Sequence, residues 1–202
     1  MRELLEKIFE KIKRQPKDIL GYEDLYHMCI SNIGEDNNLA VEYLKKLSDT
    51  IEEVMPKLDD IEVLQKLFGL HKKVLLGAAP YDFESYILYI EWDREPDKKF
   101  YPPRRRVLRQ VVNALQELVD DKLDLLAVSL PPGAGKSTLA IFFLTWLAGK
   151  RPNEPKLTGS HSNAFIRGVY DECLRILETN SEYLWHDVFP MVNVSSTNAK
   201  DC

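Results

Sequence analysis

The chain has 202 residues, of which 45% are hydrophobic and 29% are charged, and its formal net charge is −5 at pH 7. This composition is typical of a globular protein. The negative balance argues against a chain devoted to unspecific nucleic-acid binding, although it allows a local basic stripe. Three widely spaced cysteines, Cys29, Cys173 and Cys202, predict neither a disulfide framework nor a zinc site. They indicate a reducing intracellular compartment.

The first residues, 1–14, alternate charged and apolar side chains, so they do not match a secretory signal peptide. No uninterrupted apolar run reaches the ~18 residues of a membrane span. We therefore expect a protein of the cytoplasm that has no membrane partner.

Residues 1–92 are expected to form a helical region, because their apolar residues recur at the spacing of one helix face. We expect the third helix to end at Gly69, and residues 83–92 fit either a helix or a strand. No set of residues in this region suggests catalysis, so we interpret it as a packing or partner-binding element. The apolar stripes cover residues 4–12, 40–54 and 61–68.

Residues 93–106 are rich in proline and charge and are interpreted as a linker. From residue 107 to 202 the pattern predicts an α/β domain. Short apolar runs at 123–130 and 155–162 are typical of parallel strands covered on both faces. Helices are expected beside them, and this alternation is that of a parallel sheet. The expected helices cover residues 104–119, 136–149 and 163–178.

The segment 131–138 reads PPGAGKST and matches the phosphate-binding pattern G-x-x-x-x-G-K-[ST], except that Leu130 replaces the first glycine. Its glycines can turn successive amides toward an anion, and Lys136 would reach the β- and γ-phosphates. Ser137 would place its hydroxyl on Mg²⁺, and the following helix adds its positive end. The alternative is an ordinary strand-to-helix turn that contains glycines. The sequence therefore predicts ATP and Mg²⁺ as cofactors, with phosphates bound by Pro132, Gly133, Ala134, Gly135, Lys136, Ser137 and Thr138.

A proline pair before G-x-G-K-[ST] resembles the loop of helicase-type motors and of phage DNA-packaging ATPases. The flanking sequences FYPPRRRVLRQVVNALQELVDDKLDLLAVSLPP and TWLAGKRPNEPKLTGSHSNAFIRGVYDECLRIL resemble the large subunit of tailed-phage terminases over residues 100–177. The resemblance implies a P-loop NTPase sheet of the RecA/terminase type. It also implies an ATPase that packages viral DNA into a procapsid in the cytoplasm of the bacterial host.

The same resemblance implies double-stranded DNA, a small terminase subunit and the portal as partners, and a homo-oligomeric ring in the full-length protein. By position it assigns Tyr101, Arg104 and Gln110 to the adenine. Basic residues also crowd the start of the helix at 104–119, where the helix dipole disfavours them. They would gain from nucleotide or DNA phosphate, and the alternative is a solvated turn paired with neighbouring acids.

The residues after Ser137 include no acid at the end of an apolar strand run, so we identify no Walker B acid and no catalytic glutamate. A nuclease carboxylate cluster is also absent from the sequence. We therefore expect an incomplete ATPase domain at 107–202, from a truncated chain that binds nucleotide without hydrolysing it. Two alternatives stay open. One is another P-loop motor of the helicase type, and the other is a non-catalytic helical module that binds a partner.

Overall fold

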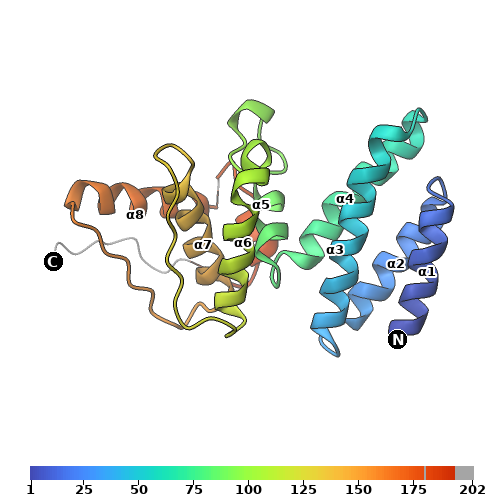
Figure 1. Cartoon of the computed structure of the whole chain (residues 1–202), viewed down its shortest axis with the longest axis horizontal. Coiled ribbons are helices and arrows are strands. Elements are labelled where there is room, and N and C mark those ends of the chain that lie inside the picture. The colour runs from blue at the N-terminus through green and yellow to red at the C-terminus, as the bar shows by residue number, and fades with distance from the viewer. Residues whose placement is uncertain (180, 194–202) are drawn as a thin grey trace. The chain divides into compact units, whose positions relative to one another are not determined.

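A computed structural model describes residues 1–179 and 181–193 (Figure 1). These residues form nine α-helices and three short 3-10 helices, and no strand is found among them. The predicted α/β fold, with the start of a RecA/terminase-like parallel sheet after a helical N-terminal region, is therefore wrong. The chain divides into two compact units, Met1–Ser85 and Tyr86–Cys202.

The two segments predicted as strands show why the sheet prediction failed. Residues 123–130 and 155–162 have no regular secondary structure. Leu125 is 84% exposed and Leu157 is 99% exposed, so neither segment is covered on both faces. An apolar run predicts a buried strand only if other segments supply the neighbouring strands, and no other strand is found among the described residues.

The first unit is built from four helices: α1 (Arg2–Arg14), α2 (Ile19–Asn32), α3 (Asn37–Val54) and α4 (Ile61–Ala78). Each helix packs against the next one along the chain, and the 3-10 turn η1 (Met55–Lys57) follows α3. The predicted helices at 4–12, 40–54 and 61–68 are confirmed. However, α4 continues past Gly69, because a helix tolerates an interior glycine at a modest cost.

Aspartates fix where three of these helices begin. The carboxylates of Asp18, Asp36 and Asp60 accept backbone N–H groups from the first turns of α2, α3 and α4. Such caps satisfy donors that have no partner inside the helix. The helices then bury one continuous apolar core, which includes Leu5, Phe9, Ile12, Tyr22, Leu25, Tyr43, Leu44, Leu47, Ile51, Leu67 and Val74.

Most of α5 (Phe83–Ile90) and all later helices belong to the second unit. The long helices are α6 (Arg105–Val119), α7 (Lys136–Lys150) and α8 (Asn163–Leu177), which confirm the helices predicted there. The expected linker, 93–106, contains two 3-10 turns, η2 (Pro96–Lys98) and η3 (Pro102–Arg104). Within the described residues, no helix has both the length and the apolar character needed to cross a membrane.

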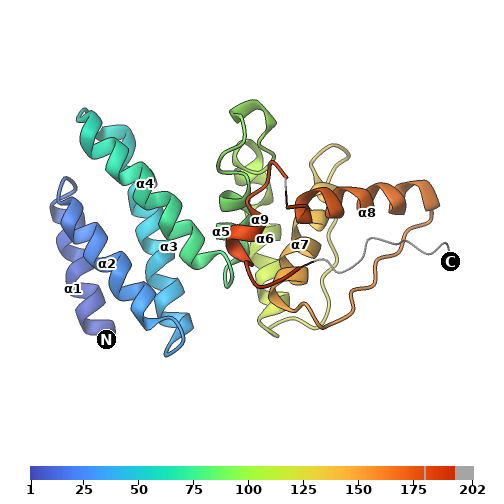
Figure 2. The ribbon, with the colours of Figure 1, turned by 180° about the vertical axis from the view of Figure 1, so that it is seen from behind.

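The core of the second unit is aromatic, and α7 runs through it. The Tyr86 hydroxyl lies 2.8 Å from the Thr145 hydroxyl, and the Trp185 Nε1–H donates to the Thr145 carbonyl at 3.0 Å. Trp185 begins the short helix α9 (Trp185–Val188), which lies beside the end of α5 (Figure 2). At the other end of α7 from the loop, Phe189 packs on Gly149, where a Cβ atom would come within 2.1 Å of the ring.

Candidate functional site

The glycine-rich loop ends at the start of α7 and has an unusual backbone. Gly133 has φ = 79° and Gly135 has φ = 99°, a left-handed conformation that residues with a Cβ atom rarely adopt. The Ala134 N–H donates to the Pro131 carbonyl at 3.3 Å and closes the turn between the prolines and the glycines. The prediction that these two glycines take backbone angles unfavourable to other residues is confirmed.

The N-terminus of α7 lies directly behind this turn. Gly135 is its N-cap residue, and this residue has no side chain that could cap the first turn of the helix. The first amides of a helix have no partner within it and carry its positive dipole end. Lys136 and Ser137 are exposed, and Thr138 is half-buried. The structure therefore presents backbone donors, an ammonium group and hydroxyl groups at one place.

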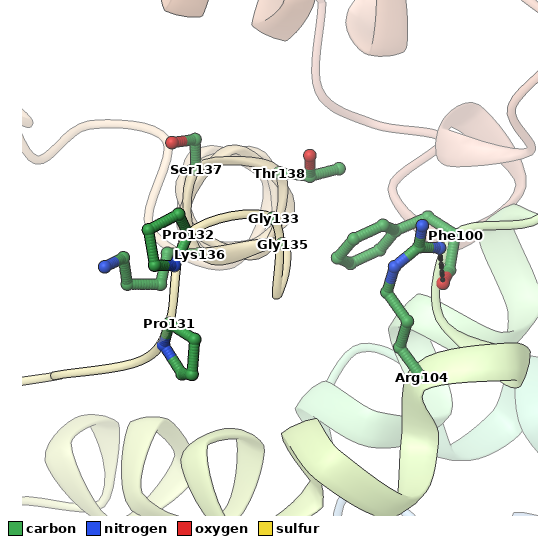
Figure 3. Close-up of a pocket in the computed structure, with 9 residues that line it drawn as sticks. All are labelled: Phe100, Arg104, Pro131, Pro132, Gly133, Gly135, Lys136, Ser137 and Thr138. Atoms are coloured by element: carbon green, nitrogen blue, oxygen red, sulfur yellow. Dashed lines mark hydrogen bonds between the residues drawn. The ribbon is translucent and has the colours of Figure 1, made fainter.

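An open cavity of about 430 Å³ lies at this place (Figure 3). Of the residues predicted to bind phosphate, only Ala134 is not part of the cavity wall. Two residues from the segment before α6 complete the lining. The lining residues are Phe100, Arg104, Pro131, Pro132, Gly133, Gly135, Lys136, Ser137 and Thr138.

Phe100 lies directly against the loop. A Cβ atom on Gly135 would come within 2.5 Å of Phe100 Cε2, so only glycine fits beneath this ring. The Arg104 guanidinium lies 5.1 Å from the centre of the same ring, and its Nη1 donates to the Phe100 carbonyl at 3.0 Å. Phe100 and Arg104 thus form one wall of the cavity, on the opposite side of the glycine turn from the Lys136 side chain (Figure 3).

The ammonium group of Lys136 contacts the entry of its own loop. Its Nζ donates to the Leu130 carbonyl at 2.7 Å, while the side chain stays exposed to water. A carbonyl oxygen is a neutral acceptor, and an anionic oxygen would form a stronger, charge-assisted bond with the same group. The lysine is therefore placed to exchange this partner for an anion.

The three residues expected at the adenine lie in different surroundings. Arg104 lines the cavity. Tyr101 is fully buried, and Gln110 is exposed on α6 and is not part of the cavity wall. Phe100 and Tyr101 are neighbours in the chain, and the former lies against the loop while the latter lies in the core. Phe100 was not among the predicted site residues, and its one signal in the sequence is its place before Tyr-Pro-Pro.

The basic residues near this wall are partly paired with neighbours. Lys98 forms an ion pair with Glu95 at 3.0 Å, and Lys99 Nζ donates to the Trp92 carbonyl at 2.7 Å. These contacts agree with the solvated, locally paired turn that was the alternative to a phosphate-binding cluster. Arg104 differs from them because its guanidinium reaches the cavity.

Within the part of the chain that the structure describes, no group of three or more His, Cys, Asp or Glu residues could hold a metal ion. Burial raises the pKa of the Cys29 thiol to about 12 and that of Cys173 to about 11, so both thiols are protonated at neutral pH. Cys202 lies outside the described residues. Comparisons of the chain with protein-family models, curated proteins and solved structures find no match.

Proposed function

We propose that this chain binds the phosphates of ATP, together with Mg²⁺, in the cavity beside residues 131–138. The observation that carries the proposal is the convergence of two left-handed glycines, the N-terminus of α7 and Lys136 on one open cavity. Backbone amides in such a turn and at a helix end form an anion-binding concavity. ATP is the expected nucleotide because the sequence resembles ATP-driven motors.

Each polar group of the loop has a definite task in this proposal. Lys136 exchanges the Leu130 carbonyl for phosphate oxygens, and its charge offsets that of the triphosphate. Ser137 fits as a Mg²⁺ ligand, since this ion keeps several waters and takes its remaining ligands from phosphate and one or two protein oxygens. Bound Mg²⁺ would neutralise phosphate charge.

The wall formed by Phe100 and Arg104 would bind the rest of the nucleotide. The aromatic ring offers a flat apolar face to a base, and the guanidinium offers donors to phosphate or ribose oxygens. None of the nine residues that line the cavity is an aspartate or a glutamate. Hydrolysis requires an acidic group to position water and metal, so the proposed activity is binding with negligible turnover.

A role in viral DNA packaging is proposed on the resemblance of residues 100–177 to terminase large subunits. In that role, the nucleotide site would belong to an ATP-driven motor that acts on double-stranded DNA. The small terminase subunit and the portal are the proposed partners, and a ring of several copies is the proposed assembly.

The proposal is tested by titrating the purified chain with MgATP in a calorimeter. Wild-type protein is expected to bind, and Lys136→Ala to weaken binding about 10- to 100-fold, because it removes a charged donor to phosphate. Lys122→Ala is the matched control, since this lysine is exposed, pairs with Asp120 and lies outside the cavity. Equal affinities of the wild type and Lys136→Ala, or no binding by the wild type, would contradict the proposal.

A further inference from the structure

Glu91 follows α5 and is a fully buried carboxylate of the second unit. Both of its oxygens accept the Phe100 N–H, at 2.9 and 3.1 Å, and Oε2 also accepts the Tyr101 N–H at 3.0 Å. Arg94 Nη1 donates to Oε1 at 2.8 Å. A buried carboxylate is strongly unfavourable unless its oxygens are bonded. Here, two successive backbone amides and one guanidinium satisfy it.

Arg94, which bonds Glu91, is itself held by two further contacts. Its guanidinium lies 4.4 Å from the centre of the Tyr183 ring, and Nη2 contacts Glu182 Oε1 at 3.3 Å. The Arg94 side chain is only 10% exposed. Glu91 is therefore held by Arg94 as well as by the two amides, and its carboxylate is a fixed point to which the backbone at Phe100 is attached.

The backbone that Glu91 holds carries the cavity wall. The ring of Phe100 lies against Gly135, and the carbonyl of Phe100 accepts the Arg104 guanidinium. A displacement of the backbone at Phe100 would therefore move both groups of the wall. Glu91 itself does not line the cavity, so any effect on a ligand must pass through this segment.

We propose that Glu91 is a positioning residue of the nucleotide site, which holds Phe100 and, through it, Arg104 against the phosphate-binding loop. This inference rests on the proposed function. A buried ion pair such as Glu91 and Arg94 contributes little net stability, because desolvation of both charges offsets their attraction. The specific benefit of a carboxylate here is that one side chain accepts two successive amides and fixes their direction.

The test compares Glu91→Gln with Glu95→Gln by MgATP titration. Glutamine keeps the shape but replaces one acceptor oxygen by a donor, which would face an N–H group of Phe100, Tyr101 or Arg94. Glu91→Gln is expected to weaken MgATP binding about 10-fold. Glu95→Gln, which alters an exposed residue outside the cavity, should change it less than about twofold.

A second comparison separates positioning from a general effect on the fold. In a chain that already carries Phe100→Ala and Arg104→Ala, the wall is absent, so adding Glu91→Gln should change MgATP affinity less than about twofold. A loss of about 10-fold in that background as well would overturn the proposal. Loss of the wild-type circular dichroism spectrum in Glu91→Gln would assign Glu91 to the fold and would also overturn it.

Hydrogen exchange of the wild-type chain tests the arrangement without any variant. The amides of Phe100 and Tyr101 should exchange at least ~100-fold more slowly than unprotected amides, and rapid exchange would overturn the inference. The two proposals fail in different ways. A wild-type chain with protected amides that binds no MgATP would refute the proposed function, whereas wild-type affinity in Glu91→Gln would refute only the role of Glu91.

Discussion

Helices α4 and α7 begin in opposite ways, one in each unit of the molecule. The carboxylate of Asp60 accepts the N–H groups of Glu62 and Val63, so the chain itself satisfies the donors at the start of α4. At the start of α7, a left-handed glycine replaces the capping side chain, and the adjoining loop borders a cavity. A capped helix start serves the fold, whereas a start without a side-chain cap keeps its amides available to an anion.

The largest loss of MgATP binding is expected from a substitution in the glycine turn at the start of α7. Gly135→Ala should abolish measurable MgATP binding or weaken it about 100-fold, because it combines left-handed strain with a clash against Phe100. Unfolding in urea should show a loss of about 2 to 4 kcal/mol in stability.

Gly133→Ala is the matched control for stability. Gly133 is also left-handed, but a Cβ atom there would have no neighbour within 4 Å. We expect a loss of only about 1 kcal/mol from backbone strain. Equal losses in the two variants would show that Phe100 does not press on the loop.

A smaller change of ATP affinity is expected when Mg²⁺ or its proposed ligand Ser137 is removed. Removing Mg²⁺ with a chelator should weaken ATP binding to the wild type about 10-fold, and Ser137→Ala should reduce that dependence to about twofold. Ser129→Ala, which alters an exposed serine outside the cavity, should behave as the wild type. If Ser137→Ala leaves the Mg²⁺ dependence of ATP binding unchanged, Ser137 is not a ligand of Mg²⁺.

The smallest change is expected from removing the N-cap of α4, and it concerns stability and not binding. Asp60→Ala should lower the free energy of unfolding by about 1 kcal/mol, since α4 loses its N-cap, and it should leave MgATP affinity unchanged. Asp59→Ala is the neighbouring control, because Asp59 is exposed and does not cap the helix. A change of MgATP affinity in Asp60→Ala would contradict the separation of roles between the two helix starts.

The sequence predicted the features of the structure that depend on residues close together in the chain. The helix at 105–119 and the glycine turn before Lys136 follow from local periodicity and local backbone preference, and both are present. Helix α2 lies in the region that was expected to be helical, but its bounds were not predicted, since its apolar residues do not form a single stripe. The strand predictions at 123–130 and 155–162 failed because apolar character gives no information about the partners that a strand requires.

The part of the site that depends on distant residues could not be predicted. Phe100 meets Gly135 only because the chain folds back between them, and no spacing rule connects the two. Tyr101 was selected for its place in a resembling segment, but the structure buries its ring in the core. Glu91 lies in the segment 83–92, which fitted either a helix or a strand, and its role as an acceptor for two amides leaves no pattern in the sequence.

The close contact between Phe189 and Gly149 has a mechanical consequence for α7. A helix of 15 residues is about 22 Å long, and this one joins the glycine turn at its first residue to a tightly packed ring near its last. A Cβ atom on residue 149 would overlap the Phe189 ring, so only glycine allows this contact. One regular helix therefore connects the wall of the cavity to the contact between Gly149 and Phe189, so a shift of α7 along its axis would alter both.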